Sequence, residues 1–275
     1  MITDLRSKLS VYIGELLSAG RTVFTREEAQ NALGITHGAF LDAAERLQRR
    51  NALISPRRGF YVIVSPQFTA WGAPPPSWYI DALMHYETAD YYVGLLQAAA
   101  LHGASHQAVM EFQVVSAKRL PQIKAGRSRI AFYFRKDFAS IAPGLEESKT
   151  ETGYMKLSSA ALTALDLLRY PRAGGGIDNI ATVIKELAPQ INAKQLAELA
   201  QGTEKPVVQR LGYLLDWLGE QKIADKLWSS LSERGAFGWV EFDRAEAKDP
   251  IFMPEVIERN ARWGVIVRRY PEPDS

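Results

Sequence analysis

The sequence contains no cysteine, so disulfide bonds, thiolate metal sites and cysteine nucleophiles are excluded. It also lacks an apolar N-terminal run of signal-peptide type and any apolar stretch long enough to span a membrane. We therefore expect a cytoplasmic protein without membrane contacts. Neither sign of charge is in clear excess, because the formal net charge is only +2. A binding partner must be inferred from where the charges lie rather than from their sum.

Motifs for catalysis and for metal binding are missing as well. His102 and His106 are four residues apart, but Gly103 between them favours a helix end over a pair of metal ligands. Residues 174–176 are glycines before an expected helix, yet they lack the Gly-Lys-Ser/Thr ending of a nucleotide P-loop and follow no strand. No Gly-x-Ser-x-Gly elbow, zinc-protease helix or paired-carboxylate motif occurs. The sequence predicts a non-enzymatic protein with no metal and no cofactor.

The stretch from residue 24 to residue 64 shows the pattern of a winged helix-turn-helix. Thr25 can cap a short helix, and Glu28 three residues later completes a capping box. Gly34 can end that helix, because glycine adopts the left-handed backbone of a helix stop, and Thr36 can cap the next helix. Two β-rich runs then flank a turn at residues 55–59. A first amphipathic helix over residues 2–19 is expected to pack beneath this unit.

The second helix of this pattern is the expected recognition helix. Phe40, Ala44 and Leu47 form its apolar stripe, so the opposite side should face solvent. Residues near the start of a recognition helix normally reach base edges, and residues further along contact phosphates. The candidate base readers are Thr36, His37, Ala39 and Asp42, and the candidate phosphate contacts are Arg46, Arg49 and Arg50. Asp42 can also pair with Arg46 four residues later.

Arg57 and Arg58 lie at the expected tip of the hairpin, where a wing would meet DNA phosphates. Winged helices also mediate protein contacts, and that alternative stays open. Arginines on both the helix and the hairpin favour DNA.

A proline-rich segment, residues 71–76, is expected to be a stiff linker between two domains. Residues 1–70 would form the winged helix-turn-helix domain, and residues 77–275 a larger domain. Its expected elements are a helix over residues 88–101, strands at residues 112–116, 129–134 and 152–157, and mainly helices from residue 158. This mixture shows no βαβ alternation and predicts an α+β fold. The expected core of the first domain is Leu9, Ile13, Leu16, Phe24, Phe40, Leu47 and Val62.

Residues 112–136 form a second basic segment without a single aspartate or glutamate. Its cations are Lys118, Arg119, Lys124, Arg127, Arg129, Arg135 and Lys136. They could form a solvated face paired with acids from elsewhere in the fold. They could equally form a second nucleic-acid or phosphate contact.

Taken together, these segments resemble the AbiE antitoxin family, the regulatory halves of abortive-infection toxin–antitoxin operons. The resemblance rests on residues 57–62, 91–94, 98–103, 107, 112–116, 158–171 and 210–215. It implies a protein that binds operator DNA and represses its own operon. It also implies that the protein counteracts a cognate nucleotidyltransferase-like toxin, usually without a stable complex, through its C-terminal domain.

Two other functions remain open at this stage. The chain could be a one-component transcriptional regulator whose second domain senses a small ligand. It could also be an enzyme or a nucleotide-binding protein that uses the basic segment and the glycine run. A neighbouring nucleotidyltransferase gene would favour the antitoxin.

Overall fold

The computed structural model describes residues 2–104, 110–243, 245 and 253–273, and the side chains of residues 2–7 are not described. The chain has a mixed α+β fold, as the sequence predicts. Its contacts divide it into two compact units. The first contains residues 1–91, 110–134 and 147–156, and the second contains residues 92–109, 135–146 and 157–275.

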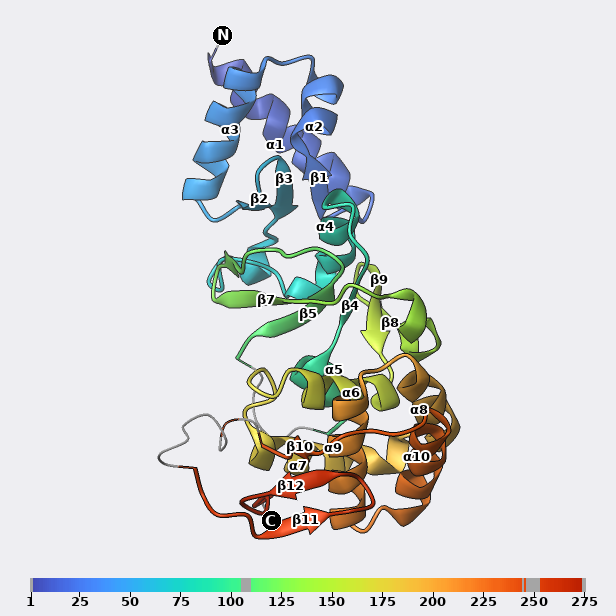
Figure 1. Cartoon of the computed structure of the whole chain (residues 1–275). Helices are drawn as coiled ribbons and strands as arrows, with labels where there is room; N and C mark the ends of the chain where they lie inside the picture. The colour runs from blue at the N-terminus through green and yellow to red at the C-terminus, as the bar shows by residue number, and fades with distance from the viewer. Residues whose placement is uncertain (1, 105–109, 244, 246–252, 274–275) are drawn as a thin grey trace. The chain divides into compact units, whose positions relative to one another are not determined.

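The N-terminal part of the first unit consists of helices and a small antiparallel sheet (Figure 1). The helices are α1 (Ile2–Ser18), α2 (Arg26–Leu33) and α3 (His37–Arg49). The strands are β1 (Val23–Thr25), β2 (Leu53–Arg57) and β3 (Phe60–Ile63), in the order β1-β3-β2. The register between β2 and β3 shifts between Ile54 and Arg57, so the hairpin carries an irregularity close to its turn.

The ends of α2 and α3 form as their sequences predict. The Thr25 side chain accepts a hydrogen bond from the backbone N–H of Glu28, and the Glu28 carboxylate accepts one from the backbone N–H of Thr25. Gly34 ends α2 in the left-handed conformation, with φ of 60°. Thr36 caps α3 by accepting from the N–H of Ala39. The turn between the two helices is therefore defined by local hydrogen bonds.

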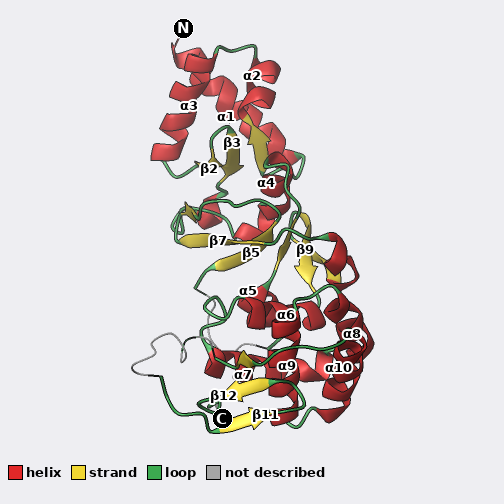
Figure 2. Ribbon diagram, in the orientation of Figure 1, coloured by secondary structure: helices red, strands yellow, loops and turns green. Residues whose placement is uncertain are grey.

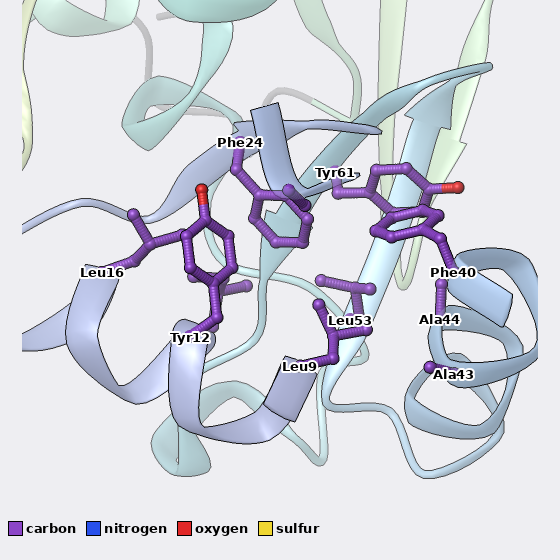
Figure 3. Packing of buried hydrophobic residues seen from close by; sticks show 11 residues of the cluster. Leu9, Tyr12, Leu16, Phe24, Phe40, Ala43, Ala44, Leu53 and Tyr61 are labelled. Atoms are coloured by element: carbon purple, nitrogen blue, oxygen red, sulfur yellow. The ribbon is translucent and has the colours of Figure 1, made fainter. Parts of the chain in front are cut away.

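A cluster of aromatic and aliphatic side chains holds the helices against the sheet (Figure 3). The ring of Tyr61 on β3 stacks on Phe24, at a centroid distance of 5.5 Å, and meets the edge of Phe40 at 5.2 Å. Of the predicted core, Leu9, Leu16, Phe24 and Phe40 are buried here, and Ile13 and Leu47 pack against the cluster.

Val62, the remaining residue of the predicted core, is buried but lies outside this cluster. Side chains alternate along a strand, so Tyr61 and Ile63 face the helices while Phe60 and Val62 face the opposite side. Val62 is fully buried there. Phe60 contacts the ring of Tyr86 at 5.4 Å, so β3 is buried on both faces.

The remainder of the first unit adds helix α4 (Ile80–Tyr86) and several strands. These are β5 (Phe112–Ser116), β6 (Ile123–Ala125) and β7 (Ser128–Phe134), with parts of β4 (Tyr91–Val93), β8 (Leu145–Thr150) and β9 (Gly153–Ser158). The six-stranded sheet has the order β6-β7-β5-β4-β9-β8. The strands predicted from the sequence match β5, β7 and β9. The helix predicted over residues 88–101 is wrong in its first half, because residues 91–93 form β4.

The proline-rich segment is packed rather than extended in solvent. Ala73, Pro74 and Pro76 are buried. The carbonyl of Trp71 accepts a hydrogen bond from the backbone N–H of Arg127 at 3.0 Å. Gly126 lies so close that a Cβ atom on it would fall 2.3 Å from the same carbonyl. The segment therefore belongs to the first unit, and independent folding of residues 1–70 stays a prediction.

The second unit is mainly helical (Figure 2). Its helices are α5 (Leu95–Leu101), α6 (Ala160–Arg169), α7 (Ile177–Leu187), α8 (Ala193–Gln201), α9 (Lys205–Trp217) and α10 (Gln221–Glu233). A small sheet of β10 (Val240–Glu241), β11 (Glu258–Asn260) and β12 (Val265–Val267) has the order β10-β12-β11. The glycine run lies in the loop between α6 and α7, as expected.

Helix α6 is the centre of this unit, because it is buried from Ala160 to Leu168 and packs against α5, α7, α8 and α9. It carries a buried ion pair in which Arg135 Nη1 donates to Asp166 Oδ1 at 2.8 Å. The hydroxyl of Tyr92 donates to the other oxygen of Asp166 at 2.7 Å. Within the described ranges, no helix is long and apolar enough to cross a membrane.

Candidate nucleic-acid interface

Helix α3 presents an exposed face whose position follows from its buried residues. Phe40, Ala43 and Ala44 are buried, and Leu47 is half-buried against the same cluster. Exposed residues are Thr36, His37, Gly38, Leu41, Asp42, Glu45, Arg49 and Arg50. The cap residue and the first turn are thus open to solvent, where a recognition helix would present its base-reading side chains.

Two residues expected on this face lie elsewhere. Ala39 and Arg46 are half-buried on the flank of α3, and Arg46 lines a groove beside Leu9 and Ser10 of α1. The sequence interpretation missed Leu41 and Glu45, which are exposed instead. The predicted apolar stripe consisted of Phe40, Ala44 and Leu47 and did not include Ala43. Because Ala43 is also buried, the buried face of α3 extends toward the side that carries Ala39 and Arg46.

The i, i+4 ion pair of α3 is also a different one from the pair that was expected. Arg49 Nη2 lies 2.7 Å from Glu45 Oε1, and both side chains are largely exposed. Asp42 forms no ion pair with Arg46 in the described part of the chain, which leaves Asp42 open on the exposed face. An exposed pair of this kind is weak, so Arg49 can exchange Glu45 for a phosphate at small cost.

Arginines gather at the C-terminal end of α3. Arg46, Arg49 and Arg50 line a groove of about 190 Å³ together with Leu9 and Leu47. Cations are favoured at this end of a helix by its dipole. The planar guanidinium group of each arginine carries several N–H donors that can bind phosphate oxygens.

The hairpin between β2 and β3 presents one arginine to solvent, not two. Arg57 is the last residue of β2, and its Nε lies 2.8 Å from Glu87 Oε1. Its Nη2 also donates to the carbonyl of Pro121 at 2.6 Å, and only 18% of its side chain is exposed. The expectation that Arg57 sits at a free tip is therefore wrong. Arg58 is exposed, while its backbone carbonyl accepts a hydrogen bond from Tyr86.

A second hairpin, β6–β7, lies beside β2 in the same unit. A cavity of about 240 Å³ is lined by Gln48 at the end of α3, Ser55 and Pro56 of β2, and Lys124 and Gly126 of the β6–β7 hairpin. The second basic segment thus reaches the immediate surroundings of α3 and the first hairpin.

The β6–β7 hairpin directs three cations to solvent. Ile123 and Ala125 are buried, so Lys124 between them points outward, and Arg127 and Arg129 are exposed as well. Lys124 and Arg129 are directly paired across the two strands. Like charges opposite each other destabilise a strand pair, so this arrangement is unfavourable unless an anion lies against it.

Of the other cations of the basic segment, Lys118, Arg119 and Arg135 have contacts within the protein, whereas Lys136 is exposed. Lys118 donates to the carbonyl of Glu87, and the guanidinium of Arg119 lies 4.2 Å from the ring centre of Phe134. Arg135 is buried in the second unit against Asp166. The segment is therefore divided between a solvated basic hairpin and residues with structural contacts.

Of the two histidines that are four residues apart, the structure describes only His102, which has a structural contact. The ring Nε2 of His102 lies 2.8 Å from the carbonyl oxygen of Ser158. His106 lies outside the described residues. In the ranges that the structure describes, no group of histidines and carboxylates is arranged to hold a metal ion.

The arrangement defines a mixed α+β protein with a basic surface on its first unit. Residues 92–217 match the family model of the AbiEi antitoxin C-terminal domain. This match confirms the resemblance to the AbiEi antitoxin family that is seen in the sequence. The match begins at the residue where the chain first enters the second unit.

A solved structure shares the fold over nearly the whole chain. The crystal structure of RV2827C protein from Mycobacterium tuberculosis superposes with a TM-score of 0.68 at 17% sequence identity. The alignment covers 95% of this chain and 91% of that one. No curated protein matches the chain in sequence.

Proposed function

We propose that the N-terminal part of the first unit is a winged helix-turn-helix and that the chain is a cytoplasmic, non-enzymatic antitoxin that binds operator DNA and represses its own operon. The observation that carries the proposal is the position of the exposed cations. Arg49 of α3, its cap residue Arg50, Arg58 of the first hairpin and the cations of the β6–β7 hairpin all belong to one unit and are exposed.

In this proposal α3 enters the major groove of the operator. Its exposed first turn, with Thr36 and His37, and the open carboxylate of Asp42 would read base edges. A carboxylate can accept a hydrogen bond from the amino group of cytosine. Arg49, Arg50 and Arg58 would contact phosphates, and Arg46 would reach a phosphate from the flank.

The β6–β7 hairpin would supply the second contact. Lys124, Arg127 and Arg129 lie near the end of α3, and a DNA strand against them would relieve the repulsion between Lys124 and Arg129. Arg57 is ion-paired with Glu87 and largely buried, so the first hairpin alone offers few phosphate contacts. This supports assigning part of the wing's usual role to the second hairpin.

The antitoxic activity is assigned to the AbiEi domain at residues 92–217. Its cognate toxin would be a nucleotidyltransferase-like protein, and the antagonism would not require a stable complex. Co-expression of the full chain with a nucleotidyltransferase-like toxin encoded beside it tests this assignment. Rescue of growth supports it, and persistent toxicity despite normal levels of the full chain contradicts it.

DNA binding is tested by the dependence of affinity on salt. Replacing Lys124, Arg127 and Arg129 by glutamine should reduce the slope of log K against log salt by roughly 0.9 for each phosphate that the protein no longer neutralises. A matched control replaces the exposed Lys149, Lys185 and Lys222 by glutamine, which makes the same change in net charge. An equal effect of both triple variants would contradict the assignment of the hairpin.

A further inference from the structure

The second unit contains a cavity of about 390 Å³ at a place where several helices begin or end. Arg169 ends α6, Gln201 ends α8 and is followed by Gly202, Glu204 precedes α9, and Arg234 follows α10. The loop that leads from Arg135 to Ser140 completes the lining. The cavity lies wholly within one unit and away from α3 and the β6–β7 hairpin in sequence.

The cations that line the cavity have hydrogen-bond donors left over. Lys136 is exposed and makes no hydrogen bond or ion pair within the described residues. Arg234 donates through Nη1 to the carbonyls of Ala200 and Thr203, at 2.6 and 2.8 Å. Its Nε and Nη2 take no part in these bonds, so one edge of the guanidinium can still donate.

The acidic groups of the cavity are already occupied. Both oxygens of Glu204 accept from Arg169. Oδ1 of Asp137 accepts a hydrogen bond from the backbone N–H of Ser140 at 3.1 Å, and this bond holds the pKa of the Asp137 carboxyl below its usual range. The cavity thus presents free donors beside engaged carboxylates, so it is suited to a ligand that accepts hydrogen bonds and carries negative charge.

The walls of the cavity are held in place from behind. Arg135 is fixed by Asp166, which positions the start of the loop that carries Lys136. A Cβ atom on Gly202 would lie 2.5 Å from Cβ of Ser140, so the end of α8 and this loop are in direct contact. A site with such fixed walls loses little entropy when a ligand binds.

We propose that this cavity binds the phosphate group of a small phosphorylated ligand, with Lys136 and Arg234 as the principal contacts. No aromatic side chain is among the described lining residues, so recognition would concern the phosphate and not a stacked base. Planar arginine and flexible lysine donors are the usual partners of phosphate oxygens. The start of α9 at Lys205 adds the positive end of a helix dipole.

The test measures binding of inorganic pyrophosphate to the full-length protein by isothermal titration calorimetry, with sulfate at equal ionic strength as the ionic control. Lys136→Gln should weaken pyrophosphate binding about tenfold, the typical value of one charge-assisted hydrogen bond. Lys226→Gln, which removes an exposed lysine of α10 outside the cavity, should leave binding unchanged. Arg234→Lys should also weaken binding, because lysine cannot donate to two carbonyls and the ligand in the same geometry.

The proposal fails if pyrophosphate does not bind the wild-type protein, or if Lys136→Gln and Lys226→Gln weaken binding equally. A third experiment measures the binding of duplex DNA to the same variants. If Lys136→Gln weakens duplex DNA binding while pyrophosphate does not bind, the cavity is part of a nucleic-acid contact and the small-ligand site is disproved. Unchanged thermal unfolding of Lys136→Gln without ligand shows that the fold is intact.

Discussion

At the scale of single residues, Asp166 is a fully buried carboxylate of the second unit that is held by two partners, Arg135 and Tyr92. It is fully buried, which raises the pKa of its carboxyl, while Arg135 and Tyr92 stabilise the charged form. Asp166→Asn should destabilise the protein by about 3–5 kcal/mol, because it leaves the charge of Arg135 buried and unpaired. Denaturant unfolding measures this change.

The control for this prediction is a double variant. Asp166→Leu combined with Arg135→Met removes both charges and should be less damaging than Asp166→Asn alone, because an apolar pair can replace a buried ion pair. A destabilisation of less than about 1 kcal/mol for Asp166→Asn would show that Arg135 finds another partner and would contradict this account.

The two arginines of the first hairpin should differ in what their removal affects. Arg57→Ala should lower stability by about 1–3 kcal/mol, because it leaves Glu87 without its half-buried partner. Arg58→Ala should leave stability within about 0.5 kcal/mol of wild type and weaken DNA binding instead. Unfolding curves and a salt titration on both variants separate the two effects. Equal behaviour of the two variants would contradict their different assignments.

At the scale of elements, the start of α2 depends on a local network. Thr25→Ala should cost about 0.5–2 kcal/mol, because it removes the acceptor for the N–H of Glu28. A hydrogen bond from Arg21 holds the pKa of the Glu28 carboxyl below its usual range. The stability from Glu28 is therefore present above about pH 4.3, its unfolded pKa, and is lost as the pH falls through the lower folded value.

Stability measured against pH checks this assignment. Glu28→Gln should be less stable than wild type at neutral pH, and the difference should shrink as the pH falls below about 4. Glu27→Gln is the matched control, because Glu27 is exposed in the same turn. A difference that does not change with pH would mean that the charge of Glu28 is unimportant.

Some elements could be predicted from local sequence patterns and others could not. The caps at Thr25, Gly34 and Thr36 were predictable because their hydrogen bonds join residues only a few positions apart. Strand β4 was not, because residues 91–93 pair with strands that lie far away in the sequence. Periodicity alone extended the neighbouring helix over them.

The same reasoning applies to the candidate interface. The exposure of Asp42 and Arg49 follows from the helical period. The ion pair between Arg57 and Glu87 joins residues 30 positions apart, and no local pattern indicates it. The position of the β6–β7 hairpin beside β2 likewise depends on tertiary packing.

At the scale of the whole molecule, the division of the chain into two units could not be predicted from the composition of its segments. Prolines at residues 74–76 are typical of a linker, yet buried contacts hold this segment in the first unit. Each unit is assembled from separate stretches of chain, so the chain passes between the units more than once. A boundary of this kind depends on which stretches pack together and has no local sequence signal.

The central claim is that α3 reads a specific DNA sequence, and a binding-site selection from a randomised duplex library tests it most directly. The full-length protein should enrich a defined site. Asp42→Ala should change the preferred base at one or more positions, since removing a base-specific hydrogen bond typically reduces discrimination by about 1–3 kcal/mol. Glu198→Ala, an exposed acid of the second unit, should keep the wild-type preference. If the wild type enriches no site, or if Asp42→Ala retains the wild-type preference at every position, the assignment of α3 as the recognition helix is contradicted.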